Sequence, residues 1–103
     1  DDGPYEGRLC NLRREKAPIC WPVALAVRNG AAEASWVGGS KKTSMLTGTI
    51  AHGGQVEITL HAWTRLGAPT EAILAGRAAD GAIVASGRWL EGGAVRGEWK
   101  RAR

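Results

Sequence analysis

The chain has 103 residues, 44% hydrophobic and 23% charged, with a formal net charge of +4. This length suits a single domain with one modest hydrophobic core, so we expect residues 1–103 to fold as one unit. The composition excludes an intrinsically disordered chain, and no apolar run approaches the roughly 18 residues that a membrane-spanning helix needs. We therefore expect a globular domain with no transmembrane segment.

The first residues and the cysteines point to an exported protein. The chain begins with Asp1 rather than Met, as it would after removal of a signal peptide. Cys10 and Cys20 flank a basic loop, residues 12–19, at a spacing that does not match a paired CxxC motif. A disulfide is the simplest interpretation, with two buried free thiols or a metal site as alternatives. Because disulfides persist in oxidising compartments, we expect a periplasmic or secreted location.

Period-two hydrophobic alternation with turn residues about every ten positions predicts an all-β fold. Val23, Leu25 and Val27 alternate with smaller or polar residues, and Asn29-Gly30 then supplies a strong hairpin signal. Glycine and proline clusters mark the other turns, and no apolar stripe at helical spacing is present. The predicted strands lie near residues 5–12, 21–28, 31–37, 43–51, 55–64, 71–79, 82–90 and 94–101.

A weak Gly-x-apolar repeat indicates how these strands close. It recurs in five of the predicted strands, and each Gly shares parity with the apolar, inward-facing residues. Small barrels alternate small and large inward residues, so we expect an antiparallel up-and-down meander that closes into a barrel. A two-sheet β-sandwich is the alternative. The expected inward set comprises Tyr5, Leu9, Trp21, Val23, Leu25, Val27, Trp36, Leu46, Ile50, Val56, Ile58, Leu60, Leu74, Ile83, Trp89, Val95 and Trp99.

The inward tryptophans have two interpretations. Trp21, Trp36, Trp89 and Trp99 are expected to fill the core, replacing the absent Phe and compensating for the inward glycines. The alternative is a barrel that binds a small apolar ligand. The inward positions are almost purely apolar, with Asn11 as the main polar exception, so we favour the packed core.

Trp63 has outward parity, together with His61 on the same strand. The next two strands place Ile73 and Val84 on their outward faces. These side chains, with the flanking Arg77 and Arg88, form a candidate partner-binding or self-association patch. The alternatives are a buried face in a sandwich or dimer, or an ordinary surface.

Arg13, Arg14 and Lys16 of the basic loop form a second candidate binding region. Their charge suits an acidic partner, an anionic glycan or a lipid headgroup, with an ordinary solvated surface as the alternative. No nucleic-acid-binding module is present. No nucleophile motif or set of metal-ligand spacings is visible, and His52 with His61 supplies only two potential ligands. We expect no enzyme activity, cofactor or metal.

The size, the early cysteine pair and the continuous meander resemble the small periplasmic inhibitors of bacterial metalloproteases. That resemblance implies an eight-stranded barrel with one disulfide, and a protease cleft as the partner. The leading hypothesis from the residues themselves is an exported, non-enzymatic module that binds a macromolecule through the outward strand face and the basic loop. A periplasmic protease inhibitor and a glycan-binding module, with Trp63 stacked on a sugar, are the alternatives.

Overall fold

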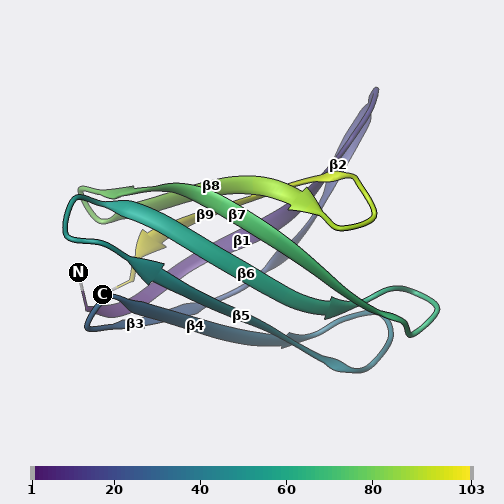
Figure 1. Cartoon of the computed structure of the whole chain (residues 1–103), viewed down its shortest axis with the longest axis horizontal. Coiled ribbons are helices and arrows are strands. Elements are labelled where there is room, and N and C mark those ends of the chain that lie inside the picture. The colour runs from purple at the N-terminus through teal and green to yellow at the C-terminus, as the bar shows by residue number, and fades with distance from the viewer. Residues whose placement is uncertain (1, 103) are drawn as a thin grey trace.

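A computed structural model describes residues 2–102, which form nine β-strands and no helix (Figure 1). The strands are β1 (Gly3–Arg13), β2 (Lys16–Pro22), β3 (Leu25–Arg28), β4 (Ala31–Val37), β5 (Thr43–Ile50), β6 (Gln55–Trp63), β7 (Pro69–Ala79), β8 (Ala82–Trp89) and β9 (Ala94–Arg101). All neighbouring strands pair antiparallel, and β9 returns to pair with β1. The expected all-β fold is therefore confirmed as an eight-stranded barrel, formed by β1 and β3–β9, with β2 as one extra strand.

The basic segment between the cysteines is not the loop that the sequence predicted. The end of β1 and the beginning of β2 pair there as a hairpin that projects beyond the barrel wall, at the upper right of Figure 1. Strand β1 pairs with β2 and with β3 in the same register, as Cys10↔Cys20 in β2 and Tyr5↔Leu25 in β3 show. Only a short interruption at residues 23–24 separates the two partner strands, so β2 continues the line of β3 past the barrel.

The outer edge of β2 has no strand partner among the described residues. The Cα atoms of Cys10 and Cys20 lie 4.0 Å apart, the close approach typical of a non-hydrogen-bonded pair. In such a ladder, the backbone N–H and C=O groups of successive residues point alternately toward the partner strand and away from it. The backbone groups of Cys20, and of Pro18 and Pro22 two residues to either side, therefore point toward the free edge. Because proline lacks an N–H, this edge offers few donors for pairing with another chain.

The core matches the inward set predicted from parity. Every member is either buried or packed against the buried cluster, and the small residues Ala32, Ala72 and Ala85 complete it. The tryptophans divide differently from the expectation. Trp99 is fully buried, but Trp21, Trp36 and Trp89 are only partly buried, so these three are not simple core fillers.

Trp99 shows why two inward glycines are required. A Cβ added to Gly97 would overlap the Trp99 ring, and a Cβ on Gly7 would come within 2.6 Å of the ring's Cδ1 atom. The indole thus lies over both glycines, and its Nε1 group donates a hydrogen bond to the Val23 carbonyl, 2.9 Å away. The sequence-based pairing of large tryptophans with inward glycines is confirmed for this residue.

The two ends of the barrel differ. One end has tight turns, including Asn29-Gly30 with φ values of 51° and 79°. Residues 2–4 lie beside residues 101–102 at this end (Figure 1). At the opposite end, residues 13–16, 38–42, 64–68 and 90–93 connect or extend the strands; we call this set the rim. Within residues 2–102, no helix offers the length and apolar character needed to cross a membrane.

Candidate functional site

A cavity of about 540 Å³ opens inside the rim. Four of the five tryptophans of the chain line it: Trp21, Trp36, Trp63 and Trp89. Its polar lining comes from Asn11, Ser44, Thr64, Arg65, Thr70 and Glu91. Apolar walls with a few polar groups in a cavity of this size are typical of small-molecule sites.

Trp21 and Trp36 form one wall of the cavity. Pairing between β3 and β4 ends at Ala26↔Glu33, and beyond it β2 and β4 have no pairing with each other. The two indole rings pack together across this region, with ring centroids 6.3 Å apart and planes tilted by 43°. The cavity wall here is therefore made of aromatic side chains instead of a hydrogen-bonded ladder.

Two hydrogen bonds fix other lining residues. The Trp89 Nε1 group donates to Asn11 Oδ1 at 2.8 Å, which joins β8 to β1. The Thr70 hydroxyl donates to the Glu91 carboxylate at 2.5 Å, which joins β7 to the loop at 90–93. The Thr70 hydrogen bond, followed by a bond to Glu91's own backbone, lowers the pKa of the Glu91 carboxyl below its usual value. Glu91 is thus a carboxylate at neutral pH.

Trp63 stands between the cavity and the outer wall. Its Nε1 group donates to the Thr43 carbonyl at 3.3 Å, and Lys42 Nζ lies 4.2 Å from its ring centroid. The cation over the ring face holds the indole from one side. Trp63 has 36% of its surface exposed, so it contributes to the rim as well as to the cavity.

One polar group of the cavity wall lacks a partner. Trp21 Nε1 is buried and donates no hydrogen bond, alone among the buried side-chain nitrogen and oxygen atoms of residues 2–102. A buried donor left unpaired costs free energy, and such groups in native proteins call for an explanation. This atom is covered by the protein, so it is not exposed to the open cavity in the structure.

The strand register separates the outward patch expected from the sequence. Trp63 lies opposite Pro69, whereas Ile73 lies opposite Thr59, four residues further along β6. Four residues of a strand span about 13 Å. The structure therefore brings Ile73 beside Arg88, and Val84 beside Arg77, but places Trp63 away from both pairs.

The histidines lie apart from the cavity lining. His61 Nδ1 is 3.2 Å from Glu71 Oε2, between exposed side chains on the outer wall. His52 lies in the turn between β5 and β6. No group of three or more His, Cys, Asp or Glu side chains in the described part of the chain is arranged to hold a metal ion.

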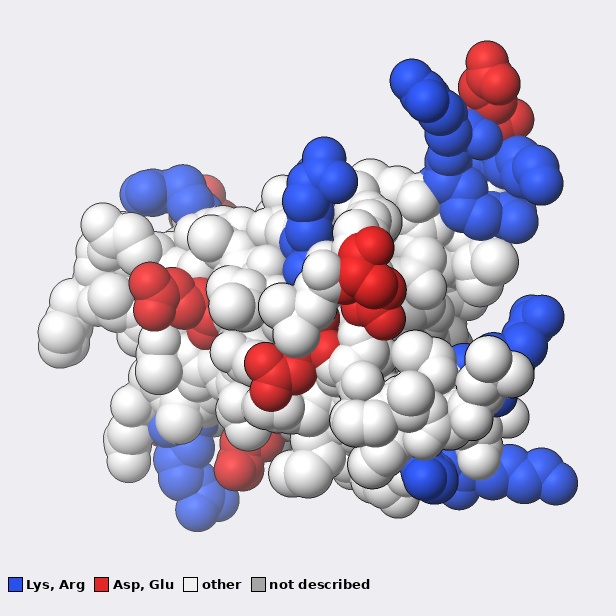
Figure 2. All heavy atoms as spheres, turned by 45° about the vertical axis from the view of Figure 1, so that its right-hand side comes forward, with Lys and Arg blue, Asp and Glu red and all other residues white. Residues whose placement is uncertain are grey.

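Arg13, Arg14 and Lys16 lie at the tip of the projecting hairpin, where basic side chains gather at the upper right of Figure 2. The Arg13 guanidinium donates to the Ala17 carbonyl through Nε and Nη2, at 2.9 and 2.7 Å. These residues belong to the rim and not to the outer-wall patch, so the two candidate regions of the sequence are separate.

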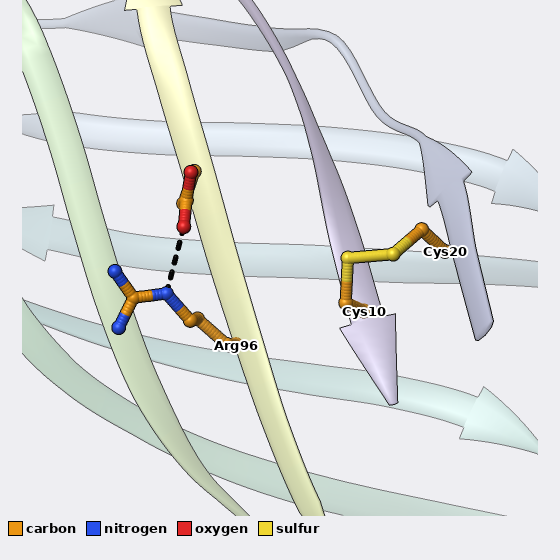
Figure 3. A network of polar contacts seen from close by, with 4 residues as sticks. Cys10, Cys20 and Arg96 are labelled. Atoms are coloured by element: carbon orange, nitrogen blue, oxygen red, sulfur yellow. Dashed lines mark hydrogen bonds and ion pairs between the residues drawn. A yellow bond between two sulfur atoms is a disulfide. The ribbon is translucent and has the colours of Figure 1, made fainter. Parts of the chain in front are cut away.

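The predicted disulfide is present, with the sulfurs of Cys10 and Cys20 2.08 Å apart, and it links β1 to β2 at the base of the hairpin (Figure 3). On the neighbouring β9, Arg96 Nε donates to Glu98 Oε2 at 2.8 Å. This hydrogen bond and the Arg96 charge lower the pKa of the Glu98 carboxyl. A small disulfide-bonded domain of this kind is compatible with an exported protein.

Reasoning from the sequence named only Trp63 among the cavity tryptophans as a binding residue. The positions of the tryptophans within their strands carry the signal that would have predicted the cavity. In a meander, the end of one strand and the beginning of the next lie at the same end of the barrel. Trp36, Trp63 and Trp89 come at or near the ends of alternate strands, and Trp21 comes near the beginning of another predicted strand. The order of the strands along the chain therefore predicts that these four tryptophans lie at the same end of the barrel.

Comparisons with protein-family models, with curated proteins and with solved structures found no match.

Proposed function

We propose that this protein is a non-enzymatic binding barrel that takes a small organic ligand with a flat ring into the cavity at its rim. The observation that carries the proposal is the arrangement of four tryptophans around about 540 Å³. Indole faces bind flat surfaces, whether aromatic rings or the apolar faces of sugars. The proposal therefore includes the glycan ligand that the sequence offered as an alternative, because a sugar ring also has a flat apolar face.

The charges near the cavity favour a ligand with an anionic group. Arg65 belongs to the lining, and Lys42 Nζ lies 4.2 Å from the centroid of the Trp63 ring. Glu91 is engaged by Thr70, so its charge is partly satisfied within the protein. A ring stacked on the indoles would direct its acidic group toward the two basic side chains.

Tryptophan fluorescence during titration with three probes tests the proposal. The probes are 1-anilinonaphthalene-8-sulfonate, a neutral disaccharide and a sulfated disaccharide. We expect saturable binding of at least one probe, strongest for an anionic ring. Trp36→Ala should weaken that binding by roughly tenfold or more, as removal of a central aromatic contact does.

Ile73→Ala is the matched control, because Ile73 is an exposed apolar residue of the outer wall, 63% exposed. It should leave binding unchanged. Circular dichroism must show an intact fold for both variants, since the naphthalene probe also binds partly unfolded chains. Absence of saturable binding for all three probes, or equal losses in both variants, would contradict the cavity as the binding site.

Recognition of a macromolecule by the outer wall is a second candidate. The supporting observation is Ile73, which is exposed and lies opposite Arg88. Ile73→Ser with Arg88→Ala should then abolish partner capture or self-association without affecting the cavity probes. We infer a periplasmic or secreted location for either function, because a structural disulfide persists there.

A further inference from the structure

The net charge of the protein is concentrated on the rim. Residues 13–16, 38–42, 64–68 and 90–93 contain six of the 14 Lys and Arg residues but only two of the ten acidic residues. The rest of the sequence is balanced, with eight basic and eight acidic residues. The rim therefore carries the whole formal charge of +4.

The most exposed large hydrophobic side chains lie at the same end. Among the described residues, Leu66 is 96% exposed, Leu90 73% and Val37 67%. Leu66 and Leu90 stand in two separate rim loops, and Val37 ends β4 where the third loop begins. Trp63 adds a partly exposed indole beside Lys42.

We propose that the rim docks on an anionic lipid surface. The apolar side chains of the loops would enter the boundary between headgroups and acyl chains, while the basic side chains remain at the level of the phosphates. Tryptophan is suited to this interface, since its ring is apolar and its N–H is polar. Long Lys and Arg side chains reach the headgroups in the same manner.

The distribution of these residues favours a lipid surface over a folded protein partner. Leu66, Leu90 and Val37 stand on separate connections around the opening of a cavity, so they form no continuous dry patch. A rigid partner would need a matching projection for each of them, whereas fluid lipid accommodates separate side chains. The proposal depends on the rim charges and exposed side chains, and not on a ligand in the cavity.

Co-sedimentation with vesicles tests this proposal. We expect binding to vesicles of phosphatidylcholine mixed equally with phosphatidylglycerol, and little binding to phosphatidylcholine alone. Lys41→Glu with Lys42→Glu should weaken binding to the anionic vesicles by roughly tenfold or more. The matched control is Arg77→Glu with Arg88→Glu, which makes the same change in net charge on the barrel wall and should have a much smaller effect.

A second pair of variants tests the apolar contribution. Leu66→Ser with Leu90→Ser should lower vesicle binding, whereas Ile73→Ser, at an exposed residue of the wall, should not. The four substituted rim side chains are exposed, and circular dichroism would verify that each variant folds.

Three results would overturn the proposal. These are no binding to the anionic vesicles, equal losses from the rim and wall charge variants, or unchanged binding after the leucine substitutions. Strong binding to a polyglutamate peptide without vesicle binding would instead assign the rim to an acidic protein. Loss of vesicle binding with intact cavity-probe binding in the leucine variant would support the rim as a lipid site that functions separately from the cavity.

Discussion

Thr70 and Glu91 are distant in sequence but meet at the edge of the cavity, where their hydrogen bond ties β7 to the loop at 90–93. Because the bond favours the charged form, the carboxyl has a lowered pKa. The stabilisation is therefore fully present above the usual value of 4.5 and is lost as the pH falls through the lowered pKa. Its energetic contribution is small, since solvent screens an exposed carboxylate.

Thr70→Val removes the donor while keeping the shape of the side chain. We expect the pKa of Glu91 to rise toward 4.5 without reaching it, because the bond to its own backbone remains. A carbon-detected NMR titration of the carboxyl groups measures this change. The pKa of Glu98, which Arg96 lowers on a different part of the barrel, is the internal control and should not move. An unchanged Glu91 pKa in the variant would contradict the assigned cause.

Gly97→Ala tests the packing of Trp99 over the inward glycines. The added methyl group would overlap the indole and approach Leu9 Cδ2 at 3.1 Å, in a fully buried part of the core. We expect a loss of about 1–3 kcal/mol in the free energy of unfolding, measured by urea denaturation. Gly39→Ala is the control, because a Cβ added there would meet no atom within 4 Å and its φ is not positive. Comparable losses in both variants would count against steric overlap.

The β1–β2 hairpin depends on its disulfide. Beyond Asn11, the hairpin has only its own two strands, and an isolated two-stranded ribbon is marginally stable in water. The Cys10–Cys20 bond is placed where the hairpin leaves the barrel. It therefore holds together a segment that carries part of the rim charge.

Cys10→Ser with Cys20→Ser should lower the free energy of unfolding by about 2–3 kcal/mol, as expected for a crosslink that closes a short loop. Amide hydrogen exchange should accelerate most at residues 11–19 and least in β6 and β7, which lie far from the crosslink along the sheet. Chemical denaturation and exchange mass spectrometry measure the two effects. Uniformly faster exchange across all strands would indicate that the disulfide stabilises the barrel as a whole.

The sequence predicted the barrel well because its strands are half-buried and antiparallel. Parity separated inward residues such as Leu60 from outward residues such as Thr59, and Asn29-Gly30 marked a tight turn correctly. Parity could not show how far along a strand two side chains stand from each other. For that reason it grouped Trp63 with Ile73, which the register separates.

The cavity was harder to predict because it depends on where pairing stops. The alternation that marks Trp21 and Trp36 as inward residues is the same for a packed core and for an open barrel end. Only the end of the β3–β4 ladder at Ala26↔Glu33 shows that these indoles line an opening. Residues 12–19 were predicted as a loop and form a hairpin instead. Their Arg, Ala and Pro residues do not alternate between apolar and polar, so they give no clear strand signal.

The barrel closes by joining its first and last strands. The β1–β9 ladder runs from Tyr5↔Arg101 to Asn11↔Val95. Arg101 also donates to the Asp2 carbonyl, and the Ala102 amide donates to the Pro4 carbonyl at 2.9 Å. The two described ends of the chain are therefore held side by side (Figure 1), and closure requires contacts between residues far apart in sequence, which slows folding.

This closeness predicts that the chain tolerates circular permutation. A short Gly-Ser linker between the two ends, with new ends opened at His52-Gly53 in the exposed β5–β6 turn, interrupts no strand ladder. We expect this permutant to keep the β-sheet circular dichroism spectrum and cooperative unfolding of the parent, and to fold faster because β1 and β9 become neighbours in sequence.

The matched control carries the same linker but opens at Leu74-Ala75, inside β7, where the cut breaks two ladders in the buried core, and it should not fold cooperatively. Stopped-flow tryptophan fluorescence measures the folding rates. A permutant opened at the turn that remains unfolded, or folds more slowly than the parent, would show that covalent closure of the β1–β9 seam does not assist assembly of the barrel.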